Sequence, residues 1–187
     1  MKSPEIIIEE TMNWVNKVVI GLNFCPFAGP VVRHQRLHVE VVPEGDIAVI
    51  LEKLIRECYF LDTSEQYETS LIVLPEFGAH DENPFESYLD ILEMAESLLE
   101  KMKFKGVYQV AGFHPDYYFE GTSKDDPANY TNRSPYPMFH VILEASVEDA
   151  IANYPNVDEI PVNNKKLARE RGEASMRALR DSCFLEE

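Results

Sequence analysis

The chain has 187 residues, 45% of them apolar, which predicts a single domain over residues 1–187 with a sizeable hydrophobic core. Its 17 Lys and Arg against 33 Asp and Glu give a formal net charge of −16, which argues against nucleic acid and anionic membrane surfaces as partners because their phosphates would repel it. The sequence has no run of about 18 apolar residues, no signal-peptide pattern and only three scattered cysteines, so we expect no membrane span, no disulfide framework and a cytoplasmic location.

The first part of the chain predicts two helices, an irregular segment and one strand. A helix begins at Ser3-Pro4, a pair typical of a helix cap and first turn, and stops near Gly21. Residues 23–35 are expected to be irregular. Residues 37–41 alternate apolar and polar side chains, as a half-buried strand does. Asp46 is expected to cap the second helix.

The remainder predicts further strands and helices in alternation. A long helix opens at Asn83-Pro84, with Glu86 in the position of a capping box. A short helix with Ser146 and Asp149 as caps, and a last helix over roughly residues 163–181, end the chain. The apolar patterns of the expected strands lie at residues 71–74, 107–113 and 138–143.

This order of elements predicts an α/β or α+β fold. Helices alternate with strands of matching length, and then two strands follow each other across a long loop. We therefore expect a small mixed sheet of about four strands with helices packed on it. The topology that we weigh is a ferredoxin-like arrangement with extra N- and C-terminal helices.

The loop between the last two strands, residues 113–137, is the most informative stretch of the sequence. Loops longer than about 12–15 residues are uncommon in compact domains and are usually functional or disordered. Aromatic side chains and prolines are frequent here, which argues against disorder. We expect an ordered loop folded over the sheet edge, whose aromatic residues form either part of a site or a satellite core.

Three segments of the sequence together resemble a known family. They are Asn-Phe-Cys-Pro-Phe-Ala at 23–28, Phe-His-Pro at 113–115 and Asn-Tyr-Thr-Asn-Arg-Ser-Pro-Tyr-Pro at 129–137. In this order they resemble the domain of unknown function family number 1415, and the likeness covers essentially the whole chain. The resemblance implies a small cytosolic protein of bacterial type and brings no catalytic assignment.

Three residues are candidates for catalysis: Cys25, His114 and Asp116. A reactive thiol needs a nearby histidine or cation that holds the thiolate. His114 and Asp116 are two residues apart, so an extended backbone places both on one side, where Asp116 would orient His114 as an acid or base. The alternatives are a buried, inert Cys25, a His114 bonded to a backbone carbonyl and an Asp116 that starts a turn.

Four residues are candidates for ligand binding: Asn129, Asn132, Arg133 and His140. The guanidinium of Arg133 matches a carboxylate or phosphate, and the two asparagines would orient that group, so a small anionic molecule is the expected ligand. An internal ion pair is the alternative for Arg133. His140 shares a strand face with Met138 and would either line the pocket or lie half-buried at the surface.

Two other classes of function stay open. A metal-binding domain would use Cys25, His114 and Asp116, with His140 or Glu120 added, although the sequence names no cofactor. A non-catalytic interaction module would present the aromatic loop to a partner. His34 and His38 lie in a basic segment that we interpret as a solvated strand edge, with Arg36 paired to Glu40.

Several well-known motifs are absent from the sequence. It has no Gly-rich phosphate loop, no Cys-x-x-Cys pair, no Gly-x-Ser-x-Gly elbow and no His-Glu-x-x-His. This argues against nucleotide hydrolysis, thioredoxin chemistry, hydrolase-fold esterases and typical zinc proteases. Whether the protein is an enzyme is left open.

Overall fold

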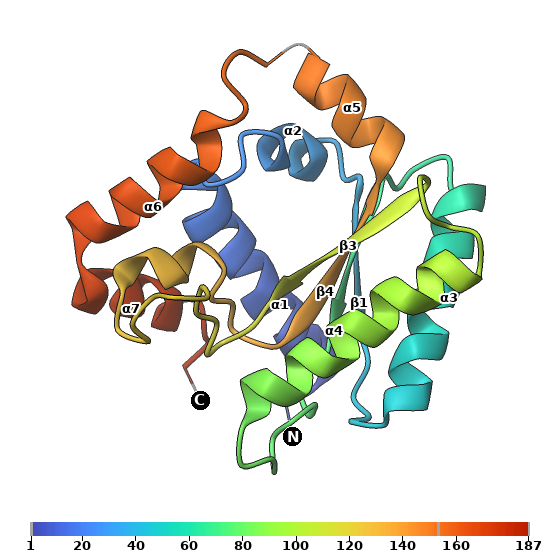
Figure 1. The fold of residues 1–187 in the computed structure, drawn as a ribbon, viewed down its shortest axis with the longest axis horizontal. Coiled ribbons are helices and arrows are strands. Elements are labelled where there is room, and N and C mark those ends of the chain that lie inside the picture. Colours follow the sequence, from blue (N-terminus) through green and yellow to red (C-terminus); the bar gives the residue numbers. More distant parts are fainter. Residues whose placement is uncertain (1, 153, 187) are drawn as a thin grey trace.

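The protein is built on one four-stranded sheet, seen here in a computed structural model that describes residues 2–152 and 154–186. The strand order is β1-β2-β4-β3, and β4 is antiparallel to both of its neighbours, so β1, β2 and β3 all run in one direction (Figure 1). The strands are β1 (Leu37–Val41), β2 (Thr69–Val73), β3 (Tyr108–Phe113) and β4 (Met138–Leu143).

Two helices connect the parallel strands. Helix α3 (Ile47–Thr63) joins β1 to β2, and α4 (Pro84–Lys101) joins β2 to β3. The second connection passes over one strand position, which β4 later fills. The mixed sheet with packed helices is as expected, but the ferredoxin-like arrangement is wrong. That fold has the order βαββαβ, whereas these elements follow one another as βαβαββ.

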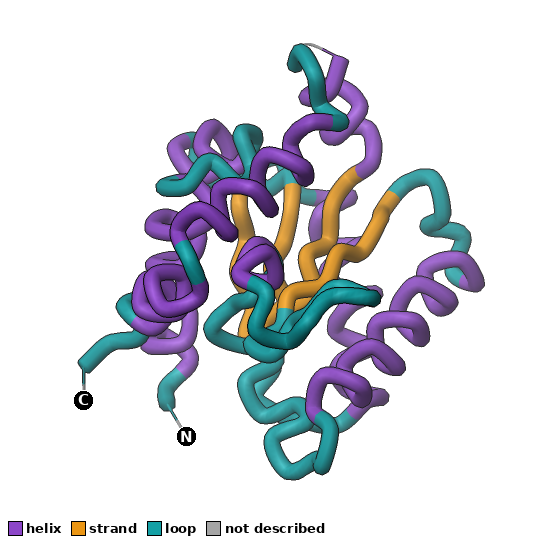
Figure 2. Tube along the Cα trace, turned by 60° about the vertical axis from the view of Figure 1, so that its left-hand side comes forward, coloured by secondary structure: helices purple, strands orange, loops and turns teal. Residues whose placement is uncertain are grey.

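Helices cover both faces of the sheet, as Figure 2 shows. Because side chains alternate along a strand, β2, β3 and β4 each contribute to two separate cores. On one face, Ile72 and Phe139 pack with α3 and α4. On the other face, Leu71 and Met138 pack with α1 (Pro4–Trp14) and the π-helix η1 (Val15–Ile20), and with buried residues of the C-terminal helices.

The expected helices are present, with differences at their ends. Asp46 caps α3 by accepting hydrogen bonds from the backbone N–H groups of Ala48 and Val49. The capping box at Asn83 is wrong. The Asn83 side chain makes no cap hydrogen bond, and Glu86 accepts from the Tyr118 hydroxyl at 2.8 Å.

Three further segments differ from the expectation. The 23–35 segment contains a short helix, α2 (Ala28–Arg33). Helix α5 (Glu144–Ala152) begins directly after β4, so Ser146 and Asp149 lie inside it and do not cap its start. The last helix is two helices, α6 (Glu159–Arg171) and α7 (Glu173–Asp181), because Gly172 between them has a φ of 81°.

The loop after β3 is ordered and contains a 3₁₀ helix, η2 (Pro127–Thr131). Its first part packs on α4, where the Phe85 ring lies 5.4 Å from Tyr117 and 5.0 Å from Tyr118. Its second part contacts α6 and α7. The loop therefore links the two cores at one end of the sheet. Among the described helices, none is long and apolar enough to cross a membrane.

A candidate ligand pocket on the sheet

A cavity of about 700 Å³ lies between the sheet and the N-terminal part of the chain. Its floor is formed by side chains from all four strands, and its walls come from α1, η1, the segment around Cys25, α2 and α5. Most lining side chains are apolar. The residues that give the pocket its shape are Trp14, Val19, Phe27, Val31, Leu37, Leu71, Phe113, Ile142, Val147 and Ala150.

His140 is the titratable ring in the floor of this pocket. Thr69 donates its one hydroxyl proton to the carbonyl of Val141 at 2.6 Å, so its oxygen accepts from His140 Nε2 at 2.8 Å. The proton of a neutral ring is therefore on Nε2, and Nδ1 keeps a free lone pair. No described residue donates a hydrogen bond to Nδ1. Burial lowers the pKa of His140 from 6.5 to about 4, so the ring is neutral near pH 7.

Cys25 lies in the wall of the same pocket and is half-buried. The residues after it shape this wall, where Phe27 meets Tyr154 edge-to-face at 5.3 Å. Opposite them, Trp14 meets Phe113 edge-to-face at 5.1 Å. Two of the residues predicted for the site, Cys25 and His140, are thus brought to one cavity by segments far apart in the sequence.

His114 and Asp116 lie outside the lining of this pocket. The His114 side chain is 1% exposed, and its ring lies 5.2 Å from Phe85 and 5.0 Å from Tyr88. His114 Nδ1 accepts a hydrogen bond from the backbone N–H of Asp116 at 3.0 Å. Burial lowers the pKa of His114 to about 4, although the charge of Asp116 acts in the opposite direction. Cys25 therefore does not share its cavity with His114 and Asp116. The catalytic roles of these three residues stay predictions.

The candidate anion-binding residues hold the long loop together. Asn129 is fully buried. Its amide nitrogen donates to the carbonyls of Ser123 and Lys124, and its oxygen accepts from the backbone N–H of Phe119 at 3.1 Å. The Asn132 side chain accepts from Thr131 at 2.9 Å.

Arg133 braces the same loop. Its guanidinium donates to the carbonyls of Tyr117 at 2.9 Å and Lys124 at 2.7 Å, and lies 4.8 Å from the centre of the Tyr130 ring. Its own carbonyl accepts from the indole N–H of Trp14 at 3.0 Å. Arg133 therefore reaches the pocket only through its backbone. The anionic ligand stays a prediction, and Arg133, Asn129 and Asn132 are not in the pocket lining.

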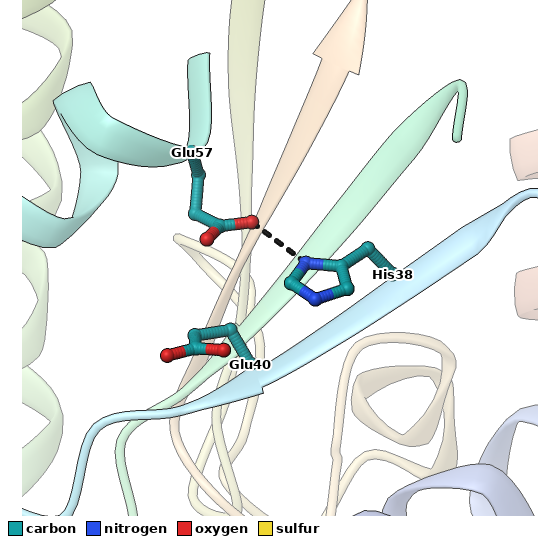
Figure 3. Close-up of side chains that lie close together, drawn as sticks. All are labelled: His38, Glu40 and Glu57. Atoms are coloured by element: carbon teal, nitrogen blue, oxygen red, sulfur yellow. Dashed lines mark hydrogen bonds and ion pairs between the residues drawn. The ribbon is translucent and has the colours of Figure 1, made fainter. Parts of the chain in front are cut away.

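A second cluster of titratable side chains lies on the opposite face of the sheet, under α3 (Figure 3). His38 and Glu40 alternate on β1 and face α3, and Glu57 reaches them from that helix. His38 Nδ1 lies 2.8 Å from Glu57 Oε2, which also accepts from the Ser70 hydroxyl at 2.8 Å. Lys53 donates to Glu40 at 2.6 Å.

Sequence reasoning missed this cluster. The sequence did contain one indication of it. His38 and Glu40 are two residues apart on a predicted strand, so their side chains lie on the same face. The expected pairing of Arg36 with Glu40 is wrong, because Arg36 pairs with Glu68. Burial alone would raise the pKa of Glu57, but hydrogen bonds from His38 and Ser70 lower it, so Glu57 stays ionised.

Comparison with known proteins gives a family match. A family model described as "Protein of unknown function (DUF1415)" matches residues 6–178. Neither the curated proteins nor the solved structures contain a match to the chain.

Proposed function

The chain belongs to the DUF1415 family of proteins of unknown function, and from its pocket we propose that it binds a small, uncharged and mainly apolar organic molecule. The single observation that carries this proposal is the cavity above His140. Its volume of about 700 Å³ lies within the range of roughly 300–1,000 Å³ that is usual for small-molecule sites, and such sites are mostly apolar with few polar groups.

The polar groups in the lining favour an uncharged ligand with a hydrogen-bond donor. His140 Nδ1 is an acceptor that no described residue uses, because Nε2 is engaged with Thr69. Among the described lining residues the one with a formal charge is Glu68, which is paired with Arg36. A ligand N–H or O–H that meets Nδ1, with an apolar body against Trp14 and Phe113, suits this lining.

The first experiment measures whether the pocket takes up such a molecule. N-phenyl-1-naphthylamine is an uncharged probe with one N–H donor, and its fluorescence rises in apolar surroundings. We expect saturable binding to the native protein. Ala150→Phe should weaken it by at least about tenfold, because the added ring fills the cavity.

Ala152→Phe is the matched control. Ala152 lies on the same helix, is exposed and does not line the pocket, so this variant should bind the probe as the native protein does. Equal binding by Ala150→Phe and the native protein would place the probe elsewhere and refute the proposal.

A second experiment examines the role of His140. His140→Phe keeps a ring of similar size and removes the acceptor. We expect roughly two- to tenfold weaker binding of the probe, which corresponds to the loss of one hydrogen bond. The N-methylated probe has no N–H donor and should bind both proteins alike. If His140→Phe lost the same affinity for both probes, the acceptor role of Nδ1 would be contradicted.

A further inference from the structure

We propose that His38, Glu40 and Glu57 form a binding site for one divalent transition-metal ion on the face of the sheet opposite the pocket. The inference does not depend on the proposed ligand. One ring nitrogen of His38 and one carboxylate oxygen from each glutamate lie within 4.8 Å of one another. Around a tetrahedral zinc ion, ligand atoms at about 2.1 Å from the metal are roughly 3.4 Å apart. Small side-chain rotations would bring the three ligand atoms from separations of up to 4.8 Å to the separations that a bound ion requires.

The cluster has coordination capacity that the protein leaves unused. Glu57 is 5% exposed, yet both of its side-chain hydrogen bonds, from His38 and Ser70, go to Oε2. No described residue donates to Glu57 Oε1, so this carboxylate oxygen keeps its lone pairs available for an ion. In Figure 3 the three side chains converge from β1 and α3 on one space.

The surroundings hold these groups in place. Ser70 is fully buried on β2 and fixes the Glu57 carboxylate, in the way that outer partners orient metal ligands. The His38 ring lies 4.7 Å from Phe60 and 5.1 Å from Tyr67, which limits its rotation. The site is thus largely formed before an ion arrives.

The donor set indicates the class of ion. One imidazole with two carboxylates suits zinc and its first-row neighbours, whereas magnesium and calcium prefer oxygen ligands alone. Two ionised carboxylates and a neutral imidazole would neutralise a divalent charge. Three protein ligands leave at least one coordination position open for water.

Lys53 is the competitor of the ion. Its ammonium group now pairs with Glu40 at 2.6 Å, and both side chains are about one-third exposed. Binding of a cation would release Lys53 to solvent. Removal of Lys53 should therefore strengthen metal binding, whereas removal of a ligand should weaken it.

The test is calorimetric titration of the metal-free protein with Zn²⁺, in a Cys25→Ser background so that the accessible thiol contributes nothing. We expect one ion per chain. Because even outer partners of metal ligands change affinity by about 10- to 100-fold, Glu40→Gln should weaken binding at least tenfold. Lys53→Met should tighten it, and Mg²⁺ should not compete.

His34→Ala is the matched control. His34 is exposed and lies four residues before His38, so its loss should leave Zn²⁺ affinity unchanged. Glu40→Gln preserves shape at a partly exposed position, and its circular dichroism spectrum should match the parent. Absence of stoichiometric Zn²⁺ binding, or equal affinity in Glu40→Gln and the parent, would overturn the proposal.

Discussion

Two neutral histidines differ in their surroundings, since His114 is buried and His140 is half-buried. His140 keeps its proton on Nε2 for Thr69, and its side chain is part of the pocket floor. His114 also keeps its proton on Nε2, because Nδ1 accepts from the Asp116 backbone, but this N–H is buried and has no partner among the described residues. An unmade hydrogen bond in the interior is unfavourable, and a charged ring there would be more so.

The depressed pKa of His114 predicts acid sensitivity. The folded-state pKa is about 4, below the ordinary 6.5, so between these values the unfolded chain binds more protons. The free energy of unfolding should therefore fall as the pH drops from about 6.5 to 4. One such group contributes at most about 1.4 kcal/mol per pH unit.

His114→Asn tests this at the level of one side chain. The asparagine oxygen can still accept from the Asp116 N–H, while the titrating ring is removed. Urea denaturation at several pH values should give a shallower slope for the variant than for the native protein. Equal slopes for the variant and the native protein would show that the buried ring of His114 does not cause the loss of stability at low pH. His140 titrates in the same range, so part of the slope should persist.

At the scale of elements, the packing of α4 on β3 depends on a missing side chain. A Cβ atom at Gly112 would lie 2.7 Å from the Tyr88 hydroxyl and 2.9 Å from a Leu92 methyl group. The Tyr88 hydroxyl cannot move freely, since it donates to the carbonyl of Met138 at 2.7 Å. This glycine therefore sets the distance between helix and sheet.

Gly112→Ala should lower the free energy of unfolding by about 1–3 kcal/mol, the usual effect of overpacking a core. Gly29→Ala on α2 is a suitable control, because its nearest contact would be the end of the Arg33 side chain at 3.3 Å. Chemical denaturation of both variants gives the comparison. A native-like stability of Gly112→Ala would mean that α4 can shift without loss.

The elements were more predictable from the sequence than their ends. The four strands follow from apolar patterns, and the Asp46 cap from its own chemistry. The Asn83 capping box was wrong because Glu86 accepts from Tyr118 instead, a residue of the long loop that sequence spacing cannot place beside it. The break at Gly172 was overlooked because the helical pattern continues on both sides of it.

At the scale of the whole molecule, the site was predictable only in part. Cys25 and His140 were recognised as site candidates and do line one pocket. Trp14 and Ala150 also line it, but only the folded topology brings them there. Arg133 and Asn129 have the chemistry of ligand-binding groups, yet they hold the loop by bonding its carbonyls. Glu57 escaped notice because the residues it meets on β1 are far away in the sequence.

The strand order has a consequence for how the protein is made. Among the described strands, β3 pairs with β4 alone, and β4 also pairs with the open edge of β2. Neither pairing can form before residues 138–143 are present. During synthesis, which proceeds from the N-terminus, a nascent chain that has not yet reached residue 138 can pair β1 with β2 but cannot add β3 to the sheet. The floor of the pocket and the support of α4 are therefore completed together, by a single late strand.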